Sequence, residues 1–192
     1  MQTWVLPALL GLGLAAATGL RTFLPLLMLA VVARFGWFGV GLNPHVAWLG
    51  SNAALAALGV ATVVELAADK IPLVDHALSA VGTVTRPLAA ILVAGAVFTH
   101  ADPAVAAIAG LIIGAPTALA FHAAQTGTRV ASTATTAGLA NPFVSVFEDL
   151  ASAGMAALAF IAPVLVPLLL AVLLFVGWRV WRRLRAGAPR TP

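Results

Sequence analysis

The stretch TVVELAADKIPLVDH, residues 62–76, decides the fold, because it places charged side chains at the end of an apolar helix. Glu65 and Asp69 are four residues apart, so on a helix they lie on one face, one turn apart. Pro72 lacks an N–H and interrupts that helix. Charged groups are costly within a membrane, so carboxylates beside such a break are functional candidates.

The composition is that of an integral membrane protein. Of 192 residues, 62% are hydrophobic and 8% charged, whereas soluble domains carry roughly 25% charged residues. The mean hydropathy is +1.07, and the length suffices for about six spans of roughly 20 residues each. We predict an all-α polytopic membrane helix bundle, with a single transmembrane domain over residues 1–185 and a basic, polar cytoplasmic tail over 186–192. The absence of cysteine excludes disulfides and thiolate chemistry.

Basic residues set the expected orientation, because Lys and Arg are enriched on the cytoplasmic side of membrane proteins. Half of the ten basic residues lie near the C-terminus, at Arg179, Arg182, Arg183, Arg185 and Arg190. With six spans and a cytoplasmic tail, both termini are expected in the cytoplasm, and the protein in the bacterial inner membrane. The tail is a topology signal and a lipid-headgroup contact rather than a nucleic-acid surface.

The first apolar run, residues 4–33, is too long for one straight crossing. As a helix it would reach about 45 Å at 1.5 Å per residue, against a hydrocarbon core of about 30 Å. Gly19 and Pro25 both weaken a helix at this point. We predict a strongly tilted or broken first span with Arg21 at the break.

A polar stretch, residues 125–145, interrupts the second half of the chain. It can extend the preceding helix, form a re-entrant segment or line a hydrated cavity. In the helix before it, Gly110 and Gly114 are four apart, a spacing that permits close helix contact. Thr-Gly-x-Arg ends at both Arg21 and Arg129, which is compatible with an inverted repeat of three plus three spans.

The candidate transport and ion-binding residues are acidic residues and one histidine: Glu65, Asp69, Asp75, His76, Glu148 and Asp149. The candidate charge-balancing or anion-binding residues are Arg21, Arg86 and Arg129. Two carboxylates one turn apart can share a proton, which favours Glu65 and Asp69 as a proton or cation site. The structural alternative is a set of ion pairs that only holds the helices together.

Some of these residues also fit helix-capping roles. Asp75 can cap a short helix that begins at His76, and Glu148 can complete a capping box with Ser145. One helical face carries His122, Gln125 and Arg129. This face either lines a polar track or is the amphipathic end of a helix.

Catalysis and metal binding have weaker support. The sequence carries no metalloprotease, nucleophile-elbow or phosphate-loop motif, so no catalytic residues, no enzyme activity and no cofactor are expected. Carboxylates and a histidine could hold a hard metal ion, but no fixed ligand spacing supports this, and the metal assignment stays unknown.

Several short motifs occur together. They are GLR at 19–21 with FLP at 23–25, Glu65 with DKIP at 69–72 and DH at 75–76, RP at 86–87, Arg129, and NP at 141–142 with Ser145 and ED at 148–149. As a set they resemble the bacterial domain-of-unknown-function family 4126, small multi-span inner-membrane proteins. The resemblance covers nearly everything before the last helix. It implies a polytopic membrane protein and carries no established activity.

From these residues we expect a membrane transport protein, an ion- or proton-linked transporter or channel for a small solute. The expected partners are membrane lipids, a small ion or solute, and a second copy of the chain in a homodimer, without nucleic acid. A lipid or polyprenyl-phosphate translocase is the first alternative, using Arg21, Arg86 and Arg129 to hold a phosphate. The second is a structural or assembly subunit that presents small residues such as Gly110 and Gly114 to a partner.

Overall fold

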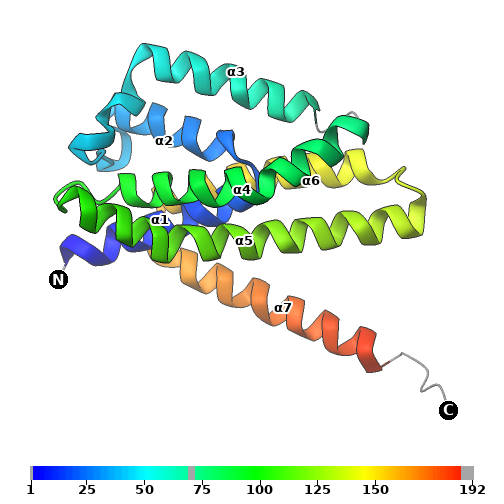
Figure 1. Cartoon of the computed structure of the whole chain (residues 1–192). Helices are drawn as coiled ribbons and strands as arrows, with labels where there is room; N and C mark the ends of the chain where they lie inside the picture. The colour runs from blue at the N-terminus through cyan, green and yellow to red at the C-terminus, as the bar shows by residue number, and fades with distance from the viewer. Residues whose placement is uncertain (1, 69–71, 187–192) are drawn as a thin grey trace.

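The computed structural model describes residues 2–68 and 72–186, with side chains described for residues 4–68 and 79–183. All regular secondary structure in this part of the chain is helical (Figure 1). The elements are α1 (Gln2–Leu20), α2 (Phe23–Phe35), η1 (Trp37–Gly39), η2 (Pro44–Gly50), α3 (Asn52–Ala68), α4 (Pro72–Ala96), α5 (Pro103–Thr136), α6 (Asn141–Ile161), η3 (Pro163–Leu165) and α7 (Val166–Ala186). The all-α prediction is confirmed.

The first two helices form a hairpin whose tip lies inside the bundle (Figure 1). Trp4, near the start of α1, packs on Phe98 with 5.9 Å between the ring centroids. Asn43, beyond the end of α2, donates through Nδ2 to the carbonyl oxygen of Phe98 at 2.9 Å and to that of Ala101 at 3.0 Å. Both arms therefore reach the same turn between α4 and α5, so the hairpin enters and leaves at one end of the bundle.

The predicted break at Arg21 is present, but the first apolar run does not cross the bundle. Instead of one bent span it forms helices of 19 and 13 residues, and 13 residues cover only about 20 Å. Pro25 lies in the first turn of α2, where a backbone N–H has no partner within the helix. The proline therefore fits the start of a returning arm rather than a kink in a continuing helix.

Among the described residues, four helices are long and apolar enough to cross a membrane alone: Ser79–Ala96, Pro103–Thr136, Asn141–Ile161 and Pro163–Arg183. A fifth span results if η2 and α3, bent by 64° relative to each other, count as one. The expected count of six crossings is therefore not confirmed in the described residues, where α1 and α2 are shorter apolar helices. The start of α1 and the end of α7 lie at opposite ends of the bundle (Figure 1).

Helices α4 and α5 are longer than the sequence predicted. α4 begins at Pro72 and continues through Pro87, so the expected short helix capped by Asp75 is wrong. α5 continues to Thr136, so the first half of the polar stretch extends this helix, as one of the three readings proposed. A turn with Gly138 at φ 86° then leads into α6.

Glycines bring α4 and α5 into close contact, as the four-residue spacing predicted. A Cβ on Gly110 would meet the carbonyl oxygen of Ile91, and one on Gly114 would meet that of Ala90. Because this contact is internal to the chain, the two glycines are not available to an assembly partner.

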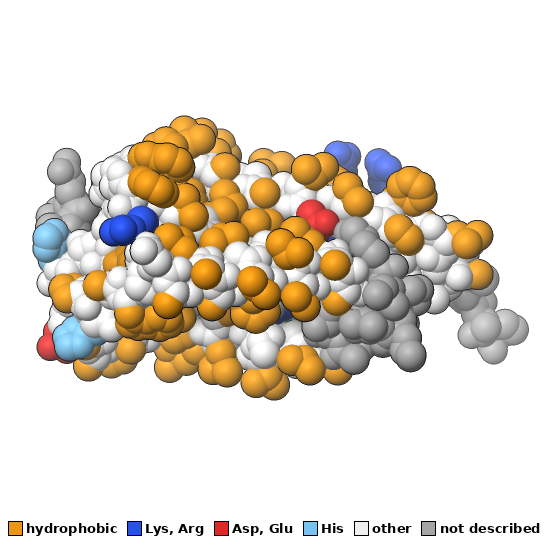
Figure 2. All heavy atoms as spheres, turned by 90° about the horizontal axis from the view of Figure 1, so that it is seen from above, with side chains coloured by type: hydrophobic (Ala, Val, Ile, Leu, Met, Phe, Trp, Pro, Cys, Tyr) orange, Lys and Arg blue, Asp and Glu red, His pale blue; other side chains and the backbone are white. Residues whose placement is uncertain are grey.

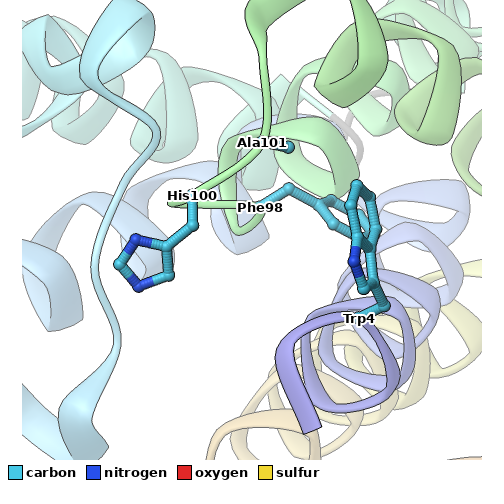
Figure 3. Close-up of a pocket in the computed structure, with 4 residues that line it drawn as sticks. All are labelled: Trp4, Phe98, His100 and Ala101. Carbon is cyan, nitrogen blue, oxygen red and sulfur yellow. The ribbon is translucent and has the colours of Figure 1, made fainter. Parts of the chain in front are cut away.

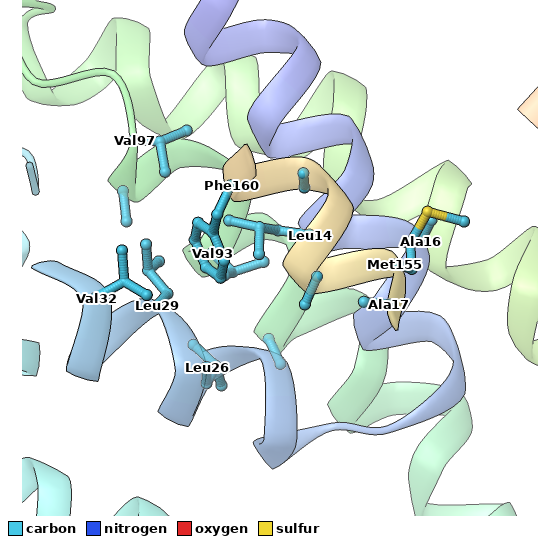
Figure 4. Packing of buried hydrophobic residues seen from close by; sticks show 14 of the residues in the cluster. Leu14, Ala16, Ala17, Leu26, Leu29, Val32, Val93, Val97, Met155 and Phe160 are labelled. Carbon is cyan, nitrogen blue, oxygen red and sulfur yellow. The ribbon is translucent and has the colours of Figure 1, made fainter. Parts of the chain in front are cut away.

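The core lies between the hairpin arms and the helices around them. Leu14 of α1, Leu29 of α2 and Val93 of α4 are fully buried together, and Phe160 of α6 closes the cluster (Figure 4). This apolar cluster fills the end of the bundle at which the hairpin enters.

The outer surface is apolar, as expected for a protein embedded in a membrane. Hydrophobic side chains are spread along the whole face in Figure 2, where few charged side chains are visible, and the histidines visible there lie at one end. α7 diverges from the other helices (Figure 1), and side chains along it such as Leu174 are exposed. Such a surface suits contact with lipid chains.

Candidate functional site

Six charged side chains from the break and four helices interact at the hairpin tip. They are Arg21 in the break, Glu65 of α3, Arg86 of α4, Arg129 of α5, and Glu148 and Asp149 of α6. Arg21, Arg86, Glu65 and Glu148 are all at least 93% buried. Within the described part of the chain, three positive and three negative side chains thus gather inside an apolar bundle, and all six belong to the sequence-predicted set.

Glu65 holds the start of α2. Its Oε1 accepts a hydrogen bond from the backbone N–H of Thr22 at 2.7 Å, and its Oε2 accepts one from Phe23 at 3.0 Å. These donors have no partner within α2, because the first N–H groups of a helix lack an acceptor one turn earlier. The amino end of a helix also carries partial positive charge, which favours a carboxylate there. Glu65 therefore caps a helix that is distant in sequence.

Arg86 and Gln125 hold the end of α1. Nη1 of Arg86 donates to the carbonyl oxygen of Gly19 at 3.0 Å, and it also contacts the side-chain oxygen of Gln125. The Gln125 amide nitrogen lies 3.4 Å from the carbonyl oxygen of Leu20. The carboxyl end of a helix carries partial negative charge, so a cation is favourable there. Both helix ends at the break are thus matched by side chains of the appropriate sign.

Gly82 has no side chain and so leaves room for the Arg86 side chain on the surface of α4. A Cβ on Gly82 would lie 3.1 Å from Nε of Arg86 and 3.5 Å from Cζ. Any larger residue would crowd the guanidinium group, so Gly82 belongs to the site although it carries no polar group.

Arg21 joins the tip to α6. Its Nε donates to Oδ1 of Asp149 at 2.5 Å, and its Nη2 donates to the backbone oxygen and Oγ of Ser145, both at 3.1 Å. Nη2 also lies 3.5 Å from Oε2 of Glu148. Arg21 is completely buried, so these contacts offset a desolvation cost of several kcal/mol.

Glu148 connects the network to the outer part of α5. Its carboxylate accepts hydrogen bonds from Arg129 through Nε at 3.2 Å and Nη2 at 2.5 Å. It accepts another from the Gln125 amide at 2.8 Å. Arg129 lies inside the continuous helix α5, whereas Arg21 follows the end of α1, so the two Thr-Gly-x-Arg motifs have different surroundings and lend the inverted repeat no support.

His122 extends the network toward the surface of α4. Its Nδ1 lies 2.7 Å from Nη1 of Arg86, and its Nε2 lies 3.2 Å from Oγ1 of Thr83. Because an arginine N–H can only donate, Nδ1 must accept, and the proton of the neutral ring is on Nε2. The polar track predicted from the spacing of His122, Gln125 and Arg129 is therefore present.

Sequence reasoning left several contributors out of the site. The prediction for Gln125 and His122 was only that they share a polar helix face. No local sequence pattern pointed to Thr83, Gly82 or the backbone groups at the two helix ends of the hairpin. The predicted capping box of Ser145 and Glu148 is wrong, because α6 begins at Asn141 and both residues lie inside it.

Among the predicted residues, Asp69 and the side chains of Asp75 and His76 lie outside the described part of the chain. Within that part, no three histidine or carboxylate side chains gather to hold a metal ion.

A pocket of about 360 Å³ reaches the network from the end of the bundle where α5 turns into α6. Its lining residues are Ser79, Thr126, Arg129, Val130, Thr133, Ala134 and Asn141. Arg129 forms part of this wall and also binds Glu148. The pocket therefore ends one side chain away from the buried carboxylate.

A second pocket, of about 240 Å³, lies at the opposite end. It is lined by Trp4, Phe98, His100 and Ala101, and the two aromatic rings lie side by side while the His100 ring turns away from them (Figure 3). Between this pocket and the tip lies the apolar cluster around Leu14 (Figure 4). The charged cluster is thus approached by a pocket from one end and separated from the other end by packed apolar side chains.

Comparison with known proteins identifies a family whose function is not known. The family described as a domain of unknown function, DUF4126, matches residues 8–183. No curated protein and no solved structure matches the chain.

Proposed function

The chain belongs to the DUF4126 family, and we propose that it is a membrane transport protein that moves an ion or small solute through the charged cluster at the hairpin tip. The observation that carries this proposal is the re-entrant hairpin, whose two helix ends lie inside an apolar bundle and are held by Glu65 and Arg86. We propose no catalytic reaction and no cofactor for it.

The physical cost of this arrangement supports a functional role. A single charged side chain at mid-membrane costs about 2.5 to 3.5 kcal/mol on insertion scales, and non-helical backbone at that depth is tolerated only where protein or a water-filled cavity satisfies it. A continuous apolar helix would avoid both costs. Broken helices whose ends face a central site are how many transporters bind their substrates.

The unequal access from the two ends supports a carrier rather than an open pore. The pocket at Arg129 approaches the cluster from one end, while Leu14, Leu29 and Val93 pack across the other. Transport then requires the hairpin to shift against α4, α5 and α6, so that the apolar seal opens as the pocket closes.

We propose the orientation from the same features. A re-entrant hairpin followed by five crossings places the two chain ends on opposite sides of the membrane, which replaces the expectation of two cytoplasmic termini. Arg179, Arg182 and Arg183 of α7 favour the cytoplasm for the C-terminal end. The start of α1 then faces the outside of the bacterial inner membrane, as does Arg34 at the end of α2.

Lipid or polyprenyl-phosphate translocation is the second candidate, favoured by the composition of the larger pocket. Its wall combines Arg129 with the hydroxyl groups of Thr126 and Thr133 and the apolar side chains of Val130 and Ala134. Such a mixture suits a headgroup joined to an acyl chain. A lipid and a small solute are separated by assaying phospholipid scrambling and ion flux on the same vesicles.

Ion flux in proteoliposomes tests the main proposal. Purified protein is reconstituted, proton and ion gradients are imposed, and flux is followed with a pH-sensitive dye. Glu148→Gln should reduce flux at least tenfold, because it removes the charge that holds Arg129. Asp102→Asn is the matched control, since Asp102 is an exposed carboxylate that caps α5 at the far end. Equal flux in wild type, Glu148→Gln and empty vesicles would overturn the proposal.

A further inference from the structure

The second half of α7 is not covered by other helices of the described chain. Val166 at the start of α7 is buried, and Leu169 and Leu170 pack partly against the apolar core. Every side chain from residue 171 to residue 183 is exposed, and the helix diverges from the bundle (Figure 1). The surface of this half of α7 is therefore available to the lipids around the protein.

Three arginines lie on one face of this half of α7. Arg182 and Arg183 follow Arg179 by three and four residues, the spacings that bring side chains together on one side of a helix. In the part of the chain that the structure describes, the ion pairs are formed by Arg21 and Arg129, and none by these three. We call Arg179, Arg182 and Arg183 the basic face of α7. Its positive charge is without a counterion among the described residues.

Aromatic rings hold two of these guanidinium groups. Cζ of Arg179 lies 6.0 Å from the centroid of the Phe175 ring, and Cζ of Arg182 lies 4.9 Å from that of the Trp178 ring. Both distances are within the range of about 6 Å over which a cation is attracted to an aromatic face. Such a contact uses the charge of the guanidinium group and leaves most of its five N–H donors for other partners. The rings therefore position the arginines on the helix surface with donors available to an anion.

The apolar stretch before Arg179 brings the basic face to the depth of the lipid phosphates. Residues 163–178 contain no charged side chain, and as a helix they would extend about 24 Å at about 1.5 Å per residue. The hydrocarbon core is about 30 Å thick. A helix that begins at one surface therefore brings Arg179 only to the inner edge of the opposite phosphates. Because a guanidinium group in the hydrocarbon is costly, lipid phosphates must approach the arginines closely.

Two general effects also place cations at the end of such a helix. Arginine is enriched on the cytoplasmic side of membrane proteins, and the carboxyl end of a helix favours positive charge. Neither effect requires the arginines to share one face or to lie over aromatic rings. The spacing of the arginines and the two ring contacts thus indicate a site for a lipid headgroup rather than a diffuse preference for one side of the membrane.

We propose that the basic face of α7, with Phe175 and Trp178, binds the headgroup of an anionic phospholipid. The phosphate accepts hydrogen bonds from the guanidinium groups, and the acyl chains lie along the exposed apolar surface of α7. A net negative headgroup, as in phosphatidylglycerol, is favoured because a zwitterionic one would bring an ammonium group among three arginines. The pocket at Arg129 is lined by α4, α5 and α6, so this lipid is a bound partner at a separate place and the inference goes beyond the proposed transport.

Quenching of tryptophan fluorescence by brominated lipids tests this inference. Trp178 becomes the single tryptophan when the other four, Trp4, Trp37, Trp48 and Trp181, are changed to phenylalanine. The protein is reconstituted in phosphatidylcholine vesicles that contain a small fraction of brominated phosphatidylglycerol or of brominated phosphatidylcholine. At equal mole fraction, the phosphatidylglycerol should quench Trp178 more strongly by about twofold or more, and the difference should remain at high salt. Equal quenching, or a difference that salt removes, would overturn the inference, because salt screens diffuse attraction far more than a close contact.

Matched variants show whether the arginines cause the preference. Arg179→Gln, Arg182→Gln and Arg183→Gln combined should remove it, whereas Arg34→Gln, at an exposed arginine at the end of α2, should leave it intact. A preference that survives in the triple variant would overturn the inference.

Native mass spectrometry serves if the single-tryptophan protein does not fold. Wild type and the triple variant are released from micelles that contain equal amounts of phosphatidylglycerol and phosphatidylcholine. Wild type should retain phosphatidylglycerol selectively and the triple variant should not, and equal retention by both would overturn the inference. Because lipid binding is measured without flux, its failure and the failure of the transport proposal are separate outcomes.

Discussion

Nε of Arg21 donates to Oδ1 of Asp149 at 2.5 Å, although the two residues are 128 positions apart in the chain. This contact joins the tip of the hairpin to α6, the helix that supplies two of the three carboxylates of the cluster. The hairpin is therefore positioned by long-range ion pairs as well as by packing, and its place in the bundle depends on the ionisation of its neighbours.

Breaking this pair from one side should be strongly destabilising. Arg21→Gln removes the guanidinium group from this pair, and breaking a buried ion pair from one side typically costs about 3 to 5 kcal/mol. Thermal unfolding in detergent measures the loss, and the double variant Arg21→Gln, Asp149→Asn should recover part of it. Strictly additive effects of the two substitutions would mean that the side chains do not act as a pair.

Glycine-to-alanine substitutions should distinguish the glycines that pack against another helix from those with open space beside them. Gly114→Ala places a methyl group against the backbone of Ala90, and Gly19→Ala places one 2.6 Å from the carbonyl oxygen of Ala118. Both variants should lower Tm, since backbone atoms cannot move aside cheaply. Gly59→Ala in α3 and Gly127→Ala in α5 meet no atom of the described residues within 4 Å and should raise helix stability by up to about 1 kcal/mol. Equal tolerance at all four positions would contradict the described packing.

The re-entrant hairpin predicts a labelling pattern that a crossing first span does not. The chain contains no cysteine, so single cysteines can be introduced without a background. Trp4→Cys, in the first turn of α1, and His45→Cys, beyond the end of α2, should react with a membrane-impermeant maleimide from the same side, together with Asp102→Cys. Leu139→Cys, exposed in the turn before α6, should react from the other side. Labelling of Trp4→Cys and His45→Cys from opposite sides would rule out the hairpin.

Part of this architecture could be predicted from the sequence, because the signals are local. The apolar runs indicate membrane helices, Gly19 and Pro25 indicate the break, and the cost of burying charge indicates that Arg21 must find carboxylates. The direction of the chain after the break could not be predicted. A helix break is compatible with a bend or a reversal, and the choice depends on contacts of Asn43 with residues 98–101, more than 50 positions later.

The role of Glu65 was also beyond local reasoning. Its spacing from Asp69, which lies outside the described residues, suggested a shared proton. The hydrogen bonds described for Glu65 are to two backbone N–H groups, 43 and 42 positions earlier. Backbone donors at a helix start carry no side-chain signature, so a sequence pattern cannot identify them as partners. Gly82 escaped notice for a similar reason, since its contribution is the space that it leaves for Arg86.

The assigned proton position on His122 predicts an order among its substitutions. Nδ1 accepts from Arg86 inside the bundle, while Nε2 faces the exposed Thr83. The side-chain oxygen of asparagine can occupy the place of Nδ1, whereas the polar end of glutamine corresponds to the place of Nε2. His122→Asn should therefore preserve Tm and any flux better than His122→Gln. Thr83→Val should cost about 1 kcal/mol or less, because it removes a partly exposed hydrogen bond. If glutamine is tolerated as well as asparagine, the acceptor for Arg86 is not Nδ1, and the link between the end of α1 and α5 depends on Gln125 alone.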